Sequence, residues 1–378
     1  MEILKNRSLK IVFVTEAYWG VLNGVVMMVM LLAAELVARG HHVTIVTSSW
    51  NQRKPTVVDG VNVYTVRGLP IGATGYSMAF PWLSKAAIRI MSEADIIHTH
   101  HPFLLGRWAQ QFGKPVFFTS HTNYVAYLHY VPLLGPSLQT WLESYLVAFC
   151  NLCVAVIAPA QAASDRLVQY GVVRTPTVIP NGIDTKMFQG GNRALWRSKL
   201  KLSVDEKLLI YVGRLAKEKR VEMCIRASCH QSQLPHLLIV GTGPSDQDLR
   251  QLVKNLDAES RIHFLGQLDH AELPDLYAAA DAFITASDSE VHPLVVIEAQ
   301  AAGLPAVVVK APGVSEIVRD HWTGLVTENT QDGFEMGIKE LLDHPRLLKQ
   351  YGLAARQYAK KFSVSSSVDA LEKLYYSV

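Results

Sequence analysis

The stretch Ala282–Val309 reads AFITASDSEVHPLVVIEAQAAGLPAVVV and contains a complete strand–helix–strand pattern. Its first four and last four residues are almost all apolar, which predicts two buried strands. Between them, Leu294–Ala302 has the length and composition of a helix, and Gly303-Leu304-Pro305 ends it. Two strands without polar alternation, joined by a helix, are typical of a parallel sheet that helices cover on both faces.

The same alternation of apolar runs and helical patterns extends through the rest of the chain. Before residue 190, strands are expected at Ile11–Thr15, His42–Ser48, Val61–Arg67, Asp95–Thr99, Pro115–Ser120, Ala155–Ala158 and Thr177–Ile179. After residue 190, they are expected at Leu208–Val212, Leu237–Val240, Ile262–Phe264, Ala282–Thr285, Ala306–Val309 and Leu325–Thr327. With right-handed helical crossovers, this order predicts an α/β fold of two Rossmann-like, doubly wound parallel-sheet domains.

Two domains also fit the length of 378 residues. Asn181-Gly182 and Gly190-Gly191 punctuate the chain between the two series of strands. The expected domains are residues 1–185 and 186–358, followed by a helix at 359–378 that crosses back to the first domain. Ligands of such folds bind outside the carboxyl ends of the strands, so functional residues should lie in loops that follow strands and face a central cleft.

The composition is that of a globular protein, with 49% hydrophobic and 18% charged residues. The apolar runs read as core elements rather than as membrane spans of about 20 residues, and the polar first ten residues do not read as a signal peptide. Cys150 and Cys153 form a C-x-x-C inside an apolar run. This context favours buried, reduced thiols over a redox or zinc site, and it indicates a cytoplasmic protein.

The charge is unevenly distributed along the chain. Residues 1–189 carry 14 Lys and Arg against 9 Asp and Glu, whereas residues 190–378 carry 22 against 24. A basic first domain can favour an anionic surface, although ordinary fluctuation explains it equally well. Phe80, Trp82 and Lys85 could begin an interfacial helix. Weak peripheral association with an anionic membrane is therefore open, and no nucleic-acid partner is expected.

Two glutamates carry the strongest chemical signal in the chain. Glu290 ends the loop after the expected strand Ala282–Thr285, and Glu298 lies about two turns into the next helix. A carboxylate can accept hydrogen bonds from two sugar hydroxyls, because it presents two oxygens with several lone pairs. The pair could therefore hold the sugar and the ribose of one nucleotide sugar. A surface glutamate and a helix ion-pair partner would be the alternative.

Several segments together resemble the GT4 family of retaining glycosyltransferases, and in particular its bacterial glycolipid-forming members. The matching segments are Ser287–Ala299 with Gly303-Leu304-Pro305, Tyr211–Lys219, Val178–Asp184, Val240–Pro244 and His121-Thr122. They occur in the family's order from Ile11 to Tyr375. The resemblance implies the GT-B fold and transfer of a hexose from a UDP- or GDP-linked sugar with retention of anomeric configuration.

The chemistry of the Tyr211–Lys219 segment agrees with this resemblance. Gly213 permits a tight turn, after which Arg214 and Lys219 lie at the start of a helix. Two cations and helix amides form a site for a diphosphate. Negative charge builds on the leaving diphosphate, so these cations stabilise the transition state. No metal or other cofactor is then required, and the chain has no convincing D-x-D ligand pair.

The resemblance also assigns roles to single residues. It implies that the catalytic residues are His121, Glu290, Arg214 and Lys219. The donor-binding residues that it implies are Gly24, Gly213, Arg214, Lys219, Gly241, Gly243, Leu265, Glu290, Leu294, Val295 and Glu298. Of these, Gly24 and His121 come from the first domain.

The acceptor is indicated by an aromatic stretch that follows His121. It is similar to the pattern H-T-x-Y-x-x-Y-x-H-Y of GT4 enzymes with lipid acceptors, and ordinary core aromatics explain it equally well. The acceptor-site residues expected on this basis are Tyr124, Tyr127, His129, Tyr130 and His101. The cluster His98, His100 and His101 lacks carboxylate or cysteine partners, so an acceptor-cleft lining is favoured over a metal site.

The chain departs from the family pattern at two places. Asn23-Gly24 stands where paired glycines are common, and His292-Pro293 stands where an aromatic residue and glycine are common. Proline has no amide hydrogen to offer a donor. A non-catalytic nucleotide-sugar-binding protein is one alternative, given Pro293. Two further alternatives are a sugar-nucleotide epimerase on the same scaffold and an NAD-dependent oxidoreductase. The last is disfavoured because Gly241-Thr242-Gly243-Pro244 lacks a third glycine.

Overall fold

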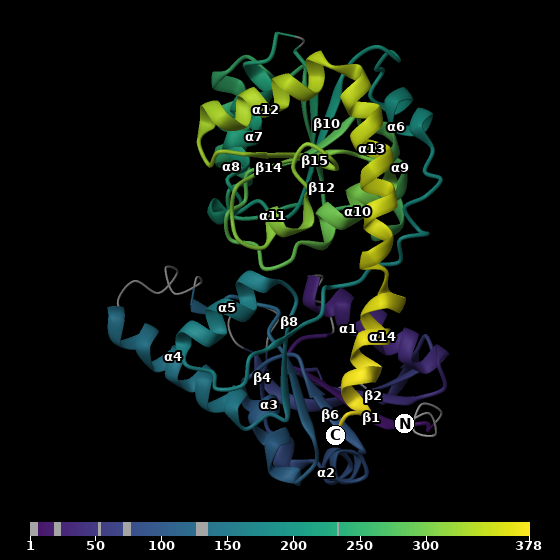
Figure 1. Ribbon diagram of the computed structural model, residues 1–378, viewed down its shortest axis with the longest axis vertical. Helices are drawn as coiled ribbons and strands as arrows, with labels where there is room; N and C mark the ends of the chain where they lie inside the picture. Colours follow the sequence, from purple (N-terminus) through teal and green to yellow (C-terminus); the bar gives the residue numbers. More distant parts are fainter. Residues whose placement is uncertain (1–6, 19–23, 52–53, 71–76, 126–134, 233) are drawn as a thin grey trace. The chain divides into compact units, whose positions relative to one another are not determined.

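The computed structural model describes residues 7–18, 24–51, 54–70, 77–125, 135–232 and 234–378. The chain forms two compact units (Figure 1). Unit 1 comprises Met1–Gly182 and Val364–Val378, and unit 2 comprises Ile183–Ser363. The chain thus leaves unit 1 after Gly182 and returns to it after Ser363. The sequence analysis placed these two domain boundaries after residues 185 and 358.

The sheet of unit 1 has the order β3-β4-β2-β1-β6-β7-β8-β9, and β5 pairs with β4. In that order the strands are Thr56–Val58, Val61–Pro70, His42–Ser49, Lys10–Thr15, Ile96–Thr99, Val116–Thr119, Ala155–Ala158 and Thr177–Val178, with β5 at Ser77–Ala79. From β4 to β9 every pair is parallel, as predicted. β3 and β5 are antiparallel to β4, which the sequence analysis did not predict.

A two-residue turn explains the first of these unexpected strands. Asp59 and Gly60 join β3 to β4 with φ angles of 49° and 77°. Two positive φ values in succession are what a tight hairpin needs, and Asp-Gly is among the sequences that supply them. The second strand corrects the expectation of a helix near Phe80. Ser77–Ala79 is a strand, Pro81–Leu83 is a 3₁₀ turn, and helix α2 begins only at Lys85.

Helices cover the unit 1 sheet, and its core is apolar. The helices are α1 (Gly24–Ala38), α2 (Lys85–Ser92), α3 (Leu104–Ala109), α4 (Gly135–Asn151), α5 (Gln161–Tyr170) and α14 (Val364–Tyr375). Cys150 and Cys153 lie in this core without disulfides, and burial raises the pKa of each thiol to about 12. The prediction of two buried thiols is therefore confirmed.

Unit 2 has the sheet order β12-β11-β10-β13-β14-β15, with every pair parallel. Its strands in chain order are β10 (Leu208–Val212), β11 (His236–Val240), β12 (Ile262–Gly266), β13 (Ala282–Thr285), β14 (Ala306–Val309) and β15 (Gly324–Thr327). Numbered from β10, this is the Rossmann order 3-2-1-4-5-6. The order reverses between β10 and β13, so the crevice where such sheets bind ligands lies between the loops that follow these two strands.

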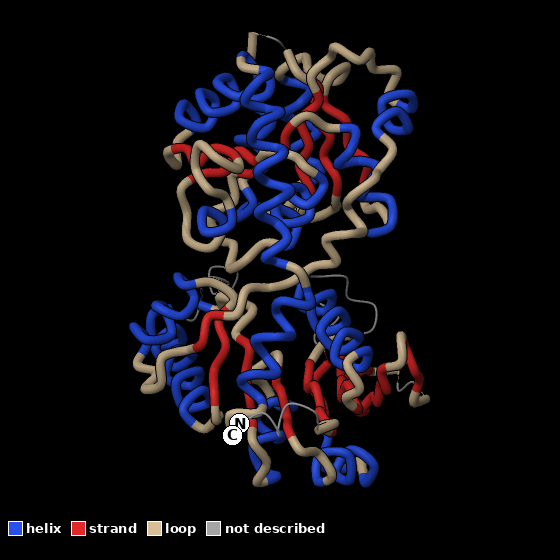
Figure 2. The backbone as a smooth tube through the Cα atoms, turned by 45° about the vertical axis from the view of Figure 1, so that its right-hand side comes forward, coloured by secondary structure: helices blue, strands red, loops and turns tan. Residues whose placement is uncertain are grey.

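Eight α-helices are assigned in the part of unit 2 that the structure describes. In each unit, the helices lie around the strands (Figure 2). They are α6 (Arg193–Lys199), α7 (Val221–Cys229), α8 (Asp246–Asn255), α9 (Leu273–Ala279), α10 (Leu294–Ala302), α11 (Val314–Ile317), α12 (Gln331–Asp343) and α13 (Pro345–Ala359). The C-terminal segment from Pro345 onward contains two α-helices. A 3₁₀ turn at Lys360–Phe362 and the extended residue Ser363 separate α13 in unit 2 from α14 in unit 1.

Helix α14 packs beside α1, and Arg39 is one of the residues that fasten it there (Figure 1). Arg39 follows α1, and its guanidinium contacts Asp369 at 2.6 Å, Glu372 at 2.7 Å and the Ser365 carbonyl at 3.0 Å. It also pairs with Glu35. Since the Arg39 side chain is only 21% exposed, these charge-assisted bonds are partly shielded from water.

Replacing Arg39 by alanine is expected to loosen α14. The loss of several charge-assisted hydrogen bonds should lower the free energy of unfolding of unit 1 by about 2 kcal/mol. Amide exchange in Val364–Tyr375 should accelerate, which mass spectrometry can measure. The control is Arg89→Ala, because Arg89 is 78% exposed and, among the described residues, its ion pair is with Glu93 at the end of its own helix. Equal exchange in both variants would contradict a fastening role for Arg39.

Candidate active site

The loops on either side of the unit 2 switch point meet through an ion pair. Lys219 lies in the 3₁₀ turn after β10, and Glu290 lies in the loop after β13. The Lys219 Nζ is 2.6 Å from the Glu290 Oε1. Their side chains are only 14% and 21% exposed. The fold therefore brings together two of the residues that the resemblance placed at the donor.

Glu290 is positioned by its own loop and by a neighbouring one. Ser287 donates a hydrogen bond to the Glu290 Oε1 at 3.0 Å. A Cβ at Gly313 would lie 2.4 Å from the Glu290 carbonyl oxygen, so the Gly313 backbone packs directly behind this residue. The Glu290 Oε2 accepts no hydrogen bond from the described residues. One carboxylate oxygen is thus held in place, and the other can accept hydroxyl groups.

Arg214 lies at the carboxyl end of β10 and is exposed. Its side chain forms no ion pair with any residue that the structure describes. Its backbone is fixed, because the Tyr211 hydroxyl donates to the Arg214 carbonyl at 3.1 Å. A cation on a fixed backbone at the switch point is suited to an anionic ligand.

The two glycines after β11 have a packing reason that the sequence analysis did not supply. A Cβ at Gly241 would lie 2.0 Å from the Gly213 carbonyl, and one at Gly243 would lie 2.2 Å from the Leu215 carbonyl. The Leu215 amide also donates to the Thr242 carbonyl at 3.0 Å. These glycines let the loop after β11 lie against the loop that carries Arg214. The structure thus links them to the position of Arg214.

Glu298 is buried in α10, with 4% exposure, and both of its oxygens are hydrogen bonded. The His270 Nε2 lies 3.1 Å from Oε1, and the Tyr277 hydroxyl donates to Oε2 at 3.1 Å. The hydrogen bond to Glu298 raises the pKa of His270. The sequence analysis missed His270 and Tyr277, since they come from separate segments with no recognisable spacing. Each Glu298 oxygen retains a lone pair for a ribose hydroxyl.

The remaining expected donor residues of unit 2 lie close to these groups in the chain. Leu294 and Val295 form the first turn of α10, whose preceding residue Pro293 supplies no side-chain cap. Helix amides in a first turn lack intrahelical partners and suit an anion. Leu265 is half-buried near the end of β12. His292 has a core role, because its ring packs 5.6 Å from the Phe362 ring and burial lowers its pKa to about 3.

In unit 1, a group of histidines lies where β6 and β7 end. His98 is in β6, His100 and His101 follow it, and His121 follows β7. The His100 Nδ1 is 2.9 Å from the His121 Nε2, and the His101 Nδ1 is 3.1 Å from the Thr15 Oγ1. Burial lowers the pKa of His98 and His121 to about 3, that of His101 to about 4, and that of His100 well below its usual value.

No group of three His, Cys, Asp or Glu side chains is arranged to hold a metal ion within the residues that the structure describes.

Gly24 is the first residue of α1, and the preceding residues lie outside the described chain. Tyr124 contacts the Phe103 ring edge-on at 5.1 Å. Tyr127, His129 and Tyr130 also lie outside the described residues.

Glu16 is a buried carboxyl that the sequence analysis did not single out. It follows β1, beside the β1–β6 switch point of unit 1, and is 4% exposed. The Leu105 amide donates to its Oε1 at 2.7 Å, so Glu16 holds the first turn of α3. Burial raises the pKa of Glu16 to about 7, against the lowering effect of the amides of Leu105 and Gly106.

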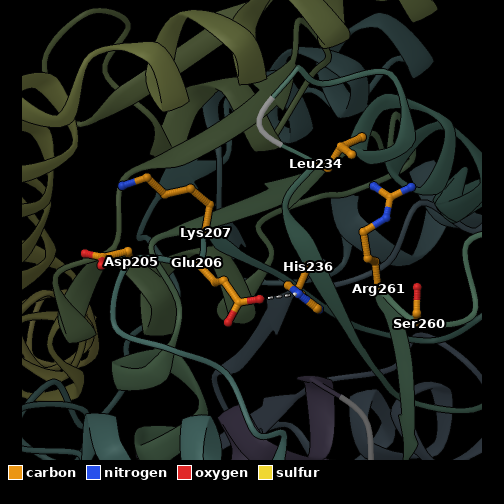
Figure 3. Close-up of a pocket in the computed structure, with 7 residues that line it drawn as sticks. All are labelled: Asp205, Glu206, Lys207, Leu234, His236, Ser260 and Arg261. Carbon is orange, nitrogen blue, oxygen red and sulfur yellow. Dashed lines mark ion pairs between the residues drawn. The ribbon is translucent and has the colours of Figure 1, made fainter.

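A separate cavity of about 530 Å³ opens at the opposite edge of the unit 2 sheet (Figure 3). Its lining residues are Asp205, Glu206, Lys207, Leu234, His236, Ser260 and Arg261. His236 begins β11 and Ile262 begins β12, so the cavity lies at the amino ends of these strands. Glu206 and His236 pair across it at 3.4 Å. It is therefore distinct from the switch-point site.

Comparison with known proteins identifies the family and the fold. Residues 192–358 match the family of glycosyl transferases group 1, and residues 22–187 match glycosyltransferase family 4. Anabaena HepE, solved with UDP and glucose, superposes with a TM-score of 0.80 at 20% identity, covering 98% of this chain and 100% of HepE. Sucrose-phosphate synthase from Thermosynechococcus elongatus superposes with a TM-score of 0.79 at 23% identity, covering 97% and 98%. The fold is thus that of the GT-B glycosyltransferases.

Sequence relatives define the family further. D-inositol 3-phosphate glycosyltransferase of Mycobacterium tuberculosis is 30% identical, over 91% of this chain and 76% of that protein. Alpha-monoglucosyldiacylglycerol synthase of Streptococcus pneumoniae is 28% identical, over 92% and 83%. The chain belongs to the GT4 family of glycosyltransferases. None of the helices in the described residues has the length and apolarity that crossing a bilayer requires.

Proposed function

We propose that this protein is a retaining, metal-independent hexosyltransferase that moves a sugar from a UDP- or GDP-linked donor to a lipid or glycolipid acceptor. The observation that carries the proposal is the Lys219–Glu290 ion pair at the unit 2 switch point. Lys219 lies in the same loop as the exposed Arg214. The names of the relatives support the substrates: one is an alpha-monoglucosyldiacylglycerol synthase and another is a GDP-mannose-dependent alpha-mannosyltransferase. HepE was solved with UDP-glucose.

The side chains divide the work on the donor. Arg214 and Lys219 neutralise the diphosphate as the bond to the sugar breaks, which replaces the charge that a metal ion would supply. The Lys219 ammonium has three donors, so it can hold Glu290 and a phosphate oxygen together. The second oxygen of Glu290 accepts sugar hydroxyls, and Glu298 accepts those of the ribose. In unit 1, Gly24 and His121 are the residues that the family resemblance assigns to the donor.

The acceptor attacks from the face that the leaving diphosphate departs, which retains the anomeric configuration. Tyr124 and His101 belong to the acceptor side, together with Tyr127, His129 and Tyr130. A lipid acceptor requires access to a membrane surface. The basic excess of residues 1–189 would then favour peripheral binding to anionic lipid on the cytoplasmic face.

An acceptor-dependence assay tests this function. The full chain is incubated with UDP-glucose, UDP-galactose, UDP-N-acetylglucosamine or GDP-mannose, with and without diacylglycerol vesicles and with and without EDTA. We expect one donor to release nucleoside diphosphate only with acceptor, at a rate that EDTA does not change. The glycosidic product should keep the donor's anomeric configuration in its NMR spectrum.

The other outcomes identify the alternatives. Conversion of the donor into an epimer without release of nucleoside diphosphate would identify an epimerase. A thermal shift with donors but no turnover with any lipid would favour a binding protein. Inversion of the anomeric centre would contradict the retaining mechanism, and loss of activity in EDTA would contradict metal independence.

A further inference from the structure

Three histidine rings form a stack in unit 1. The centroids of the His98 and His100 rings are 4.5 Å apart with an interplanar angle of 23°, and those of His100 and His121 are 5.2 Å apart at 22°. His100 is fully buried at the carboxyl end of β6, and its amide donates to the Val14 carbonyl at 2.8 Å. His121 is the most exposed of the three histidines, at 9%, against 0% for His98 and His100. The position of the His121 ring therefore depends on a side chain that is itself fixed.

The hydrogen bonding of His100 selects one arrangement of protons. A neutral imidazole carries a hydrogen on one nitrogen only. The His100 Nδ1 is 2.9 Å from the His121 Nε2, and the His100 Nε2 is buried with no partner among the described residues. If His100 carried its hydrogen on Nε2, a buried N–H would have no acceptor. Orphaned buried N–H groups are rarer in proteins than under-used acceptors, so the hydrogen belongs on Nδ1.

His121 must then accept this hydrogen bond at its Nε2, which leaves its own hydrogen on Nδ1. The Nδ1 of His121 forms no hydrogen bond with any residue that the structure describes. We propose that His100 is a positioning residue that holds His121 as the Nδ1–H tautomer, so that His121 presents a hydrogen-bond donor to an oxygen of the bound donor sugar. This inference rests on the proposed function for its ligand, whereas the tautomer itself does not.

The proposal separates two roles that a histidine can have in such a site. With Nε2 occupied by His100 and Nδ1 protonated, His121 has no lone pair to remove a proton from an acceptor. It therefore binds and orients the donor sugar, and it does not act as a general base. Loss of His100 should then change the tautomer of His121, and with it the hydrogen bond from His121 to the donor sugar.

The tautomer can be measured directly by nitrogen NMR of ring-labelled histidine in the full chain near neutral pH, with His121→Asn used to assign the signals. We expect His121 to show a protonated Nδ1 and an unprotonated Nε2. His100→Phe removes the hydrogen bond and keeps a flat ring, so His121 should shift toward the Nε2–H form. His100→Asn places an amide N–H near the former position of the His100 Nδ1, so His121 should return to its Nδ1–H form.

Activity provides the second measurement. The value of kcat/KM for the donor should fall about tenfold in His100→Phe, the effect of one misplaced hydrogen bond, and should recover in His100→Asn. Tyr375→Phe is the matched control, because it removes a 2.5 Å hydrogen bond to His98 in the same stack and leaves the His100–His121 contact in place. This control should not change the His121 tautomer.

Two results would overturn the positioning role: a protonated Nε2 on His121 in the wild-type chain, or the same His121 tautomer in wild type and His100→Phe. The wild-type spectrum alone decides the first, even if a variant fails to fold. An Nδ1–H His121 in a chain that transfers no sugar would leave the positioning role intact and would contradict the proposed function instead.

Discussion

Arg214→Ala is expected to lower kcat by about 10²- to 10³-fold while the protein stays folded. The scale is that of removing one group that stabilises charge developing in a transition state. Here the charge is that of the departing nucleoside diphosphate. The fold should tolerate the change, because the Arg214 side chain is exposed and the bond from Tyr211 goes to its backbone carbonyl. Steady-state rates of nucleoside diphosphate release measure the effect.

A matched control separates this effect from a general loss of positive charge. Lys254 is an exposed cation at the end of α8 in the same unit, and Lys254→Ala should keep the wild-type rate. Thermal unfolding should be unchanged in both variants. If Arg214→Ala turned over as fast as Lys254→Ala, the diphosphate role of Arg214 would have to be given up.

The fold was predictable because both sheets are buried on two faces. Strands such as Leu208–Val212 and Ala306–Val309 are apolar throughout, so their periodicity is visible without any knowledge of tertiary structure. The order of such strands with helices between them then leaves few possible topologies. The short strands Thr56–Val58 and Ser77–Ala79 were not predicted, because each has only three residues, too few for a periodicity to be visible in the sequence.

A site residue was predictable only where it belongs to a recognisable sequence motif. Lys219 and Glu290 each belong to one such motif, and the switch-point topology brings them within 2.6 Å of each other. His270 and Tyr277 reach Glu298 from a different loop and helix, and no spacing in the sequence signals that convergence. Glu16 was missed for a similar reason, since a lone carboxyl after a strand has no local signature.

The His292-Pro293 departure also has a physical explanation that the sequence did not reveal. The His292 side chain is buried against Phe362, in the 3₁₀ turn that follows α13. This residue therefore contributes to the core beside the Glu290 loop. The donor site can still draw on the first-turn amides of α10, since Leu294 and Val295 both have amide hydrogens.

Unit 1 is expected to lose stability steeply as the pH falls below 6.5. Burial lowers the pKa of His98 and His121 from the usual 6.5 to about 3, that of His101 to about 4, and that of His100 well below 6.5. Below pH 6.5 the unfolded chain binds protons that these folded side chains cannot bind. The stability that they confer is therefore present above pH 6.5 and is lost as the pH falls toward their folded pKa values.

Glu16 opposes this trend, and the balance sets the size of the effect. Its pKa is raised from 4.5 to about 7, so its contribution to stability is lost as the pH rises and returns as the pH falls. Each fully shifted group changes the free energy of unfolding by about 1.4 kcal/mol per pH unit. Since an unfolded histidine is only half protonated at pH 6.5, four histidines against one carboxyl give a net loss of about 3 kcal/mol between pH 6.5 and 5.5. That is a large part of a typical domain's stability.

Urea unfolding followed by near-UV circular dichroism at pH 7.0, 6.5, 6.0 and 5.5 measures this slope. His98→Asn removes one titrating ring and should make the slope between pH 6.5 and 5.5 shallower by about 1 kcal/mol per pH unit, whatever it does to the stability at pH 7. Val116→Ala is the control, because it creates a cavity in the same core and should lower stability equally at every pH. A slope that is the same in His98→Asn and Val116→Ala would show that the buried histidines do not cause the acid sensitivity. If unit 1 were equally stable at pH 7.0 and 5.5, the predicted acid sensitivity would be excluded altogether.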